Sequence, residues 1–100
     1  MSHDFVVNSI VLSPQISESI TLDFFLFPLI KYAHSRHLSG DFGEVDFTNQ
    51  IRSFVGYVSS GVVTSMYTIE FEKSIHYGSQ LSIITEADRS VTIISFMGEL

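Results

Sequence analysis

Ile83-Ile84-Thr85-Glu86-Ala87-Asp88-Arg89-Ser90-Val91-Thr92-Ile93-Ile94 is the most informative segment of this 100-residue chain. Two runs rich in β-branched residues flank a polar turn at Glu86–Ser90, which holds three of the chain's few charged side chains. β-Branched side chains favour a pleated, half-buried surface, and two such runs around a polar turn are typical of a hairpin. We therefore predict two buried strands, Leu81–Thr85 and Val91–Met97, joined by a polar tip.

The segment before this hairpin alternates between apolar and polar residues. From Val62 to Glu72 the apolar side chains recur at every second position, which places them on one face of a strand. That face holds Val63, Tyr67, Ile69 and Phe71, and the other holds Thr64, Thr68, Glu70 and Glu72. Within Lys73–Gln80, the tetrapeptide His76-Tyr77-Gly78-Ser79 is predicted to be a hairpin loop. Three consecutive strands with short links form an antiparallel meander.

The N-terminal part of the chain predicts a strand followed by a helix. Phe5–Leu12 is rich in β-branched residues and is predicted to be a first strand, while Ser13–Ser19 is predicted to be a loop or a single helical turn. Thr21 is expected to cap a helix that runs to about Leu38 and is stopped by Ser39-Gly40. Apolar residues at helical spacing form its expected buried stripe: Leu22, Phe25, Leu26, Leu29, Ile30, Ala33 and His37.

Pro28 lies in the middle of this predicted helix. Proline removes one backbone hydrogen bond from a helix interior but is tolerated in the first turn. The helix is therefore either kinked at Pro28 or begins there, and the sequence leaves both alternatives open.

A second helix is predicted after the turn-rich connector Asp41–Asp46. Thr48 is expected to cap it, Gly61 to end it after about Ser60, and one face carries an apolar stripe. That stripe consists of Ile51, Phe54, Val55 and Val58. The apolar face of the sheet needs a cover, and the two helices can supply it. We predict a single α+β domain over residues 1–100, with two helices packed on one face of a three- or four-stranded antiparallel sheet.

The composition predicts an interface. Hydrophobic residues make up 45% of the chain and the mean hydropathy is +0.30, whereas charged residues make up 16%, below the roughly 25% of an average globular domain. A domain of this size has too much surface to bury so many apolar groups by itself. We expect some of them to lie in an interface with a second copy or with a protein partner; the alternative is a Ser/Thr-rich surface that keeps a monomer soluble.

Charge and cysteine content exclude several classes of function. The net charge is −6 and the five basic side chains are scattered, so direct binding of nucleic acid is not expected, whereas an acidic surface suits basic proteins. The absence of Cys removes disulfides, cysteine-based zinc sites and thiol nucleophiles, and it fits the reducing cytoplasm. No signal peptide is evident, and the most apolar segment, Leu22–Ile30, is shorter than the ~20 residues of a membrane span. The six Gly residues form no phosphate-binding loop, so no cofactor is expected.

Two motifs carry a resemblance to a known family. The first is Ser39-Gly40-Asp41-Phe42-Gly43-Glu44 together with His37, and the second is Ile83–Thr92. They resemble a family of small proteins carried by plasmids, phages and other mobile elements, with a His-x-x-Gly-Asp-Trp-Gly helix end and an Ile-Ile-Thr-Glu-Ala-Asp-Arg-Ser-Val-Thr-Thr hairpin. The resemblance covers residues 35–97, with Phe42 in place of the Trp. It implies no catalytic residue; it implies an accessory protein of a mobile element, and such proteins often act against host defence.

The carboxylates of the connector are the first candidate site. Asp41, Glu44 and Asp46 could form an acidic patch or a divalent cation site. The alternative, which the capping preference of Asp favours, is that Asp41 or Asp46 accepts backbone N–H groups near helix ends.

Two further polar groups have a functional and a structural interpretation. His34 and His37 are spaced so that both could bind one metal ion, but no third ligand is near in sequence. We therefore expect no metal site, and we expect His34 to be exposed and His37 to pack at the helix end. Glu86, Asp88 and Arg89 could be an acid–base group, but a hairpin tip rarely forms a cleft. We expect an Asx turn at Asp88, and Arg89 bound to Glu86 or to Asp41, the latter linking the two motifs.

These observations lead to an expected function. We expect a non-enzymatic protein that binds a host defence nucleoprotein complex, with a CRISPR effector as the expected target, and blocks its basic nucleic-acid-binding surface. Its partner-binding residues would be Asp41, Glu44, Asp46, Glu70, Glu72, Glu86, Asp88 and Arg89. The alternative is a homodimeric structural or regulatory protein for plasmid maintenance.

Overall fold

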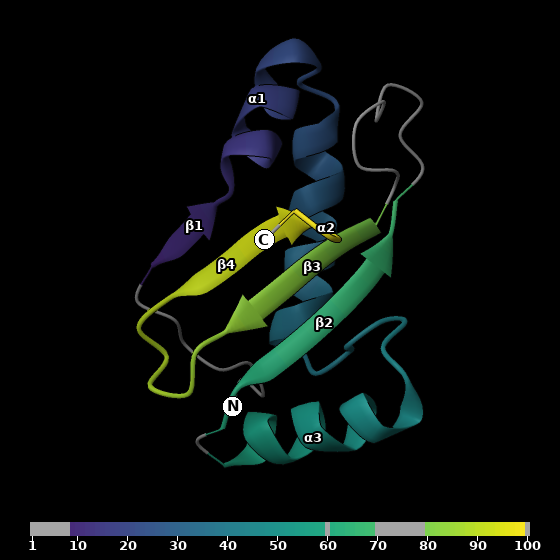
Figure 1. Ribbon diagram of the computed structural model, residues 1–100, viewed down its shortest axis with the longest axis vertical. Helices are drawn as coiled ribbons and strands as arrows, with labels where there is room; N and C mark the ends of the chain where they lie inside the picture. Colours follow the sequence, from purple (N-terminus) through teal and green to yellow (C-terminus); the bar gives the residue numbers. More distant parts are fainter. Residues whose placement is uncertain (1–8, 60, 70–79, 100) are drawn as a thin grey trace.

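The computed structural model describes residues 9–59, 61–69 and 80–99 and confirms the α+β class. Within these residues, three helices accompany one four-stranded sheet (Figure 1). The elements in chain order are β1 (Ile10–Leu12), α1 (Pro14–Leu22), α2 (Leu26–Leu38), α3 (Phe47–Val58), β2 (Val63–Thr68), β3 (Gln80–Thr85) and β4 (Thr92–Phe96). The predicted hairpin loop at residues 76–79 lies outside the described residues.

The sheet has the strand order β1-β4-β3-β2. β2, β3 and β4 form the predicted antiparallel meander, and the hairpin pairs Ile83 with Ile94 and Thr85 with Thr92. The prediction of a purely antiparallel sheet was wrong, because β1 pairs in parallel with β4 and makes the sheet mixed. A parallel pair needs a long crossover, and here the three helices together with β2 and β3 connect β1 to β4.

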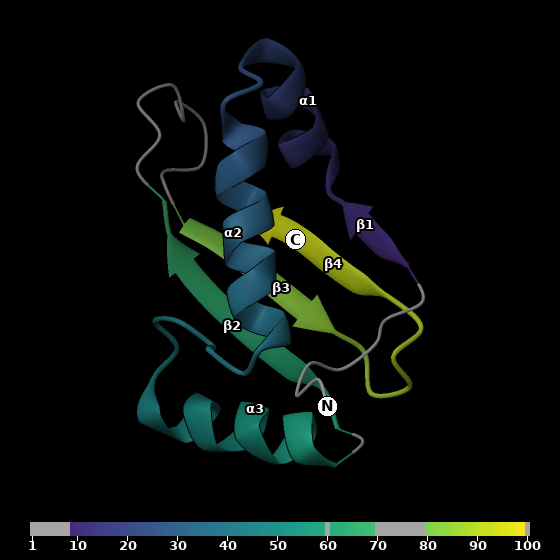
Figure 2. The ribbon, with the colours of Figure 1, turned by 180° about the vertical axis from the view of Figure 1, so that it is seen from behind.

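One face of the sheet is covered by α2, with α1 beside it. Figure 2 shows α2 running across this face, whereas no helix lies in front of the opposite face in Figure 1. Three members of the predicted inward set are buried as expected, Val63 and Tyr67 in β2 and Ile69 just after it, and Phe71 lies outside the described residues. The core between helices and sheet consists of Ile16, Leu26, Ile30, Ala33, Tyr67, Ile69, Leu81, Ile83, Ile94 and Phe96.

α1 occupies residues 14–22, where a loop or a single helical turn was predicted at residues 13–19, so the helix is longer than expected. Ser13 is its N-cap, with the Oγ atom accepting the N–H of Ile16 at 3.2 Å, and Pro14 occupies the first helical turn. Both residues favour a helix start, although Ser-Pro is also a turn signal. The Glu99 carboxylate accepts from Ser13 Oγ at 2.8 Å and from the N–H of Gln15 at 3.1 Å, so the end of the chain secures the start of α1.

α2 resolves the two alternatives for Pro28. The helix begins at Leu26, so Pro28 lies in its first turn, where the backbone N–H has no intrahelical acceptor in any case. Thr21 is part of α1 and does not cap α2, and two members of the predicted stripe, Leu22 and Phe25, are exposed. The helix ends as predicted at Ser39-Gly40, where Gly40 has φ +89°, a conformation that glycine adopts without strain.

α3 differs most from its prediction. Its N-cap is Asp46 instead of Thr48, since Asp46 Oδ1 accepts the N–H of Asn49 at 2.8 Å. The helix lies along the outer edge of β2: Ser53 Oγ donates to the carbonyl of Thr64 at 2.7 Å and accepts its N–H at 3.1 Å. The predicted apolar stripe therefore faces away from the sheet and is exposed, because the face that contacts β2 is the small one with Ser53 and Gly56.

Candidate functional site

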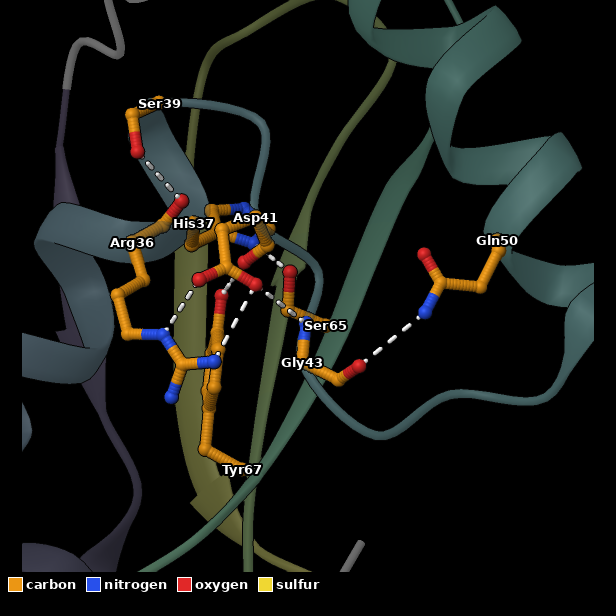
Figure 3. A network of polar contacts seen from close by, with 8 residues as sticks. All are labelled: Arg36, His37, Ser39, Asp41, Gly43, Gln50, Ser65 and Tyr67. Atoms are coloured by element: carbon orange, nitrogen blue, oxygen red, sulfur yellow. Dashed lines mark hydrogen bonds and ion pairs between the residues drawn. The ribbon is translucent and has the colours of Figure 1, made fainter.

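The connector between α2 and α3 is held by an ion pair at its first residue. Asp41 binds Arg36 through two contacts, Nε to Oδ2 at 2.7 Å and Nη2 to Oδ1 at 3.2 Å, and its Oδ1 also accepts the N–H of Gly43 at 3.2 Å (Figure 3). These hydrogen bonds lower the pKa of Asp41, and the same pair raises the pKa of Arg36. The guanidinium also lies 4.7 Å from the ring centre of Tyr67, whose hydroxyl donates to the carbonyl of Asp41. Asp41 therefore stabilises the turn, as the structural alternative predicted.

Gly43 passes very close to β2. A Cβ atom at this position would lie 2.1 Å from the carbonyl oxygen of Met66, and the residue has φ +72°. The N–H of Glu44 donates to the same carbonyl at 2.6 Å, and the N–H of Met66 donates to the carbonyl of Phe42 at 3.1 Å. The connector thus pairs with the outer edge of β2 and prevents that edge from pairing with another strand.

The remaining connector carboxylates differ in role. Asp46 caps α3, while the exposed Glu44 uses only its backbone for the contact with β2. Within the described residues, the carboxylate of Glu44 forms no ion pair. Glu44 is therefore available to an external cation or a basic partner.

His37 joins the two sequence motifs inside the protein. Its Nδ1 lies 2.5 Å from Ser65 Oγ and its Nε2 lies 2.8 Å from Thr85 Oγ1, which in turn lies 2.7 Å from Thr92 Oγ1. All four side chains are buried. Burial lowers the pKa of His37 to about 3, and the charges of His34 and Arg89 act in the same direction. The imidazole is therefore neutral and serves as a bridge between α2, β2 and β3.

This bridge also bears on two chemical interpretations. Ser65 and His37 resemble a nucleophile and its base, but both are fully buried and cannot present Oγ to a substrate. Both ring nitrogens of His37 are occupied, and the described part of the chain contains no group of three or more metal-ligating side chains.

His34 is half-buried, instead of exposed as predicted, and burial lowers its pKa. It lines an apolar cavity of about 330 Å³ between α2 and the sheet, and its Nε2 has no hydrogen-bond partner.

The hairpin tip confirms one local prediction and corrects another. Asp88 Oδ1 accepts the N–H of Ser90 at 2.9 Å, which is the predicted Asx turn, and the Ser90 hydrogen bonds lower the pKa of Asp88. Arg89 was predicted to bind Glu86 or Asp41, but it does not reach Asp41, which pairs with Arg36. At Glu86 its guanidinium donates to the backbone carbonyl, at 3.3 Å, and forms no ion pair with the carboxylate.

The guanidinium of Arg89 instead caps the C-terminal end of α3. Nη2 donates to the carbonyls of Gly56 at 2.6 Å and Ser59 at 3.3 Å, and Nη1 donates to the carbonyl of Gly61 at 2.7 Å. The last carbonyls of a helix lack intrahelical donors and carry partial negative charge, so a cation is favourable there. Arg89 therefore positions the tip against α3.

The predicted partner-binding carboxylates thus fall into two groups at opposite ends of α3 (Figure 1). Asp41, Glu44 and Asp46 precede its first turn, while Glu86 and Asp88 belong to the tip that Arg89 ties to its last turn. Of these five carboxylates, Glu44, Glu86 and Asp88 have neither a helix-capping role nor an ion pair within the described chain. Glu70 and Glu72 lie outside the described residues.

Between these two groups lies an exposed apolar surface, the α3 stripe. Its exposed fractions are 79% for Phe47, 50% for Ile51, 58% for Phe54, 54% for Val55, 63% for Val58 and 48% for the adjoining Val62. Helical periodicity identified most of these residues but not the direction they face. The signal that sequence reasoning missed is the opposite side of the helix, where Ser53 and Gly56 are small enough for close contact with β2.

Comparison of this chain with known protein families, with curated proteins and with solved structures finds no match. Within the described residues, no helix is both long enough and apolar enough to cross a membrane.

Proposed function

We propose that this protein is a non-enzymatic inhibitor of a host defence nucleoprotein complex, with a CRISPR effector as its target in the bacterial cytoplasm. It binds through the surface around α3 and blocks a basic surface that would otherwise hold nucleic acid. The observation that carries this proposal is the placement of unpaired carboxylates at both ends of an exposed apolar helix. The likeness of the His37–Glu44 and Ile83–Thr92 motifs to proteins of mobile elements supplies the cellular context.

The charges of this surface favour a basic partner. Glu44, Glu86 and Asp88 are exposed and, within the described residues, their carboxylates form no ion pair. A partner that binds nucleic acid presents clustered Lys and Arg side chains, which steer acidic proteins toward it. Carboxylates that form no ion pair within the described chain can pair with such side chains without first breaking an ion pair of their own.

Specific contact explains the surface better than imitation of DNA. Duplex DNA carries one negative charge per ~1.7 Å of its axis, which is far denser than the scattered carboxylates here. The net charge of the whole chain is −6. The inhibitor therefore occupies part of a basic groove and excludes nucleic acid sterically.

A plasmid-interference assay tests the proposal. The chain is expressed in a CRISPR-competent host, and survival of a targeted plasmid is measured. We expect the wild-type chain to protect the plasmid and the double variant Glu44→Lys, Glu86→Lys to lose most of that protection. The single variants are compared with Glu18→Lys, an equal charge change at an exposed position of α1, which should protect as the wild type does.

Affinity capture identifies the complex in the same host. The tagged chain should retain a nuclease complex that contains its guide RNA, and retention should weaken at high salt, because the contact is between opposite charges. Targeted plasmids lost as rapidly with the wild-type chain as without it would refute the proposed inhibition. Equal protection by the three single variants, Glu44→Lys, Glu86→Lys and Glu18→Lys, would refute the role of the carboxylates.

A further inference from the structure

The residues of the α3 stripe have the spacing of a helix-pairing seam. Phe47, Ile51, Phe54 and Val58 follow one another at intervals of four, three and four residues, which is the a/d pattern of two packed helices. α3 lies at one end of the molecule, and no described element covers its outer side (Figures 1 and 2). The seam therefore has no partner within the described chain.

We propose that a second copy of this protein covers the stripe, and that the two α3 helices pack antiparallel across a two-fold axis. This inference concerns self-association: it assigns the apolar α3 stripe to a second copy and leaves the carboxylates at the two ends of the stripe to the proposed target. A two-fold interface requires a surface that is complementary to itself. Antiparallel pairing meets this requirement in α3, because it sets Phe47 against Val58 of the second copy and Ile51 against Phe54.

The sizes of these side chains favour the antiparallel arrangement. Each layer then contains one aromatic and one aliphatic side chain, and large residues facing smaller ones fill a seam evenly. Parallel pairing would place each residue against its own copy, which gives two crowded layers, at Phe47 and Phe54, and two sparse layers, at Ile51 and Val58. Antiparallel helices also set opposite ends of their dipoles together.

The exposed area is sufficient for a dimer. From the exposed fractions of its six side chains, the α3 stripe has on the order of 600 Å² of surface per copy, taking ~200 Å² for a fully exposed aromatic side chain. Two copies would bury roughly 1,200 Å², which is the lower limit of a standard specific interface. We therefore expect a reversible dimer instead of an obligate one.

The charges are compatible with this pairing. Arg52 is the only charged residue of α3, and it lies off the stripe, so no charge is buried in the seam. In the antiparallel dimer, Glu44 of one copy comes near the tip carboxylates Glu86 and Asp88 of the other. Dimer affinity should therefore rise with salt, which screens this repulsion, whereas binding of a basic target should fall with salt.

Sedimentation equilibrium tests the self-association. We expect the wild-type chain to show a concentration-dependent dimer and Phe54→Asp to remain monomeric, with an unchanged circular dichroism spectrum. Phe25→Asp is the matched control, because Phe25 is an exposed aromatic residue outside the stripe, and its dimer should form as in the wild type. A wild-type chain that stays monomeric up to about 100 µM, or a dimer that survives Phe54→Asp, would overturn the inference.

Single cysteines test the direction of the helices, since the chain has no Cys of its own. Phe47→Cys and Val58→Cys should form a disulfide with each other when mixed and oxidised. Neither should cross-link well alone, because in the antiparallel dimer two copies of the same position lie ~16 Å apart along the axis. Efficient self-cross-linking of Val58→Cys would refute the antiparallel seam. A wild-type chain that dimerises but does not protect the plasmid would count against the proposed function and leave the dimer intact.

Discussion

Mild acid should destabilise this protein through His37. In the folded chain, burial among Ser65, Thr85 and Thr92 lowers the pKa of His37 to about 3, whereas the ordinary pKa of a histidine side chain is 6.5. The unfolded chain therefore binds a proton that the folded chain does not bind. Because the folded pKa is the lower one, the stability contributed by the neutral imidazole is complete above about pH 6.5 and is lost as the pH falls toward 3.

The magnitude follows from the two pKa values. One proton bound only by the unfolded chain changes the unfolding free energy by about 1.4 kcal/mol per pH unit. Between about pH 7 and pH 5 the expected loss is about 2 kcal/mol, a large fraction of the ~5–15 kcal/mol of a small domain. Asp41 and Asp88 also have lowered pKa values, but as carboxylates they contribute mainly below about pH 4.5.

Urea denaturation over a series of pH values measures this loss. The matched variant is His37→Gln, which stays neutral and can still bond to one of the two hydroxyls. We expect it to be less stable than the wild type at neutral pH by about 1–3 kcal/mol, because one buried hydroxyl loses its partner. Its unfolding free energy should depend much less on pH between about 7 and 5.

His34 provides the control for this experiment. Its pKa is also lowered by burial, so His34→Gln removes a smaller part of the same pH dependence. A pH dependence that remains in His37→Gln but disappears in His34→Gln would show that the buried bridge is not the acid-sensitive element. A wild-type chain equally stable at about pH 7 and pH 5 would refute the reasoning altogether.

Three further substitutions test the local contacts. Arg89→Ala should lower the unfolding free energy by about 2 kcal/mol, because the last carbonyls of α3 lose charged donors, and denaturant unfolding measures it. A double-mutant cycle should find a coupling energy of about 0.5–1 kcal/mol between Arg36 and Asp41, and a second cycle should find none between Arg89 and Asp41. The reverse pattern would contradict the observed ion pair. Gly43→Ala should lower the unfolding free energy by at least about 3 kcal/mol, since its Cβ would overlap the β2 backbone. Gly98→Ala is the control: Gly98 also has a positive φ but lies in open space, so the loss should be only about 1 kcal/mol. Equal losses in the two variants would contradict the role of close packing at Gly43.

The sequence predicted the elements whose signals are local. The hairpin of β3 and β4 forms where β-branched runs flank a polar turn, and the register follows from that turn. α2 ends at Gly40, where the expected positive φ is found. The first helix was missed because Ser13-Pro14 is both a turn signal and a helix start, and only the carboxylate of Glu99, distant in sequence, completes that start.

The candidate site was less predictable because tertiary neighbours determine it. Periodicity identified the apolar stripe of α3, but a stripe does not reveal whether it faces the sheet or solvent. Arg89 was expected to bind carboxylates, whereas its acceptors are backbone carbonyls of a helix that no sequence pattern places beside the hairpin tip. The link between the two motifs was likewise assigned to Arg89 and Asp41, but the bridge from His37 to Thr85 provides it.

Both proposals depend on the outward direction of the α3 stripe. Phe54→Asp tests this direction most directly when its unfolding free energy is measured at a protein concentration too low for dimers to form. Phe54 is 58% exposed, so the account predicts a loss of no more than about 1 kcal/mol in the unfolding free energy. A loss of about 4 kcal/mol or more, the cost of placing a charge where a buried Phe had been, would show that the stripe packs against the sheet and would contradict the account.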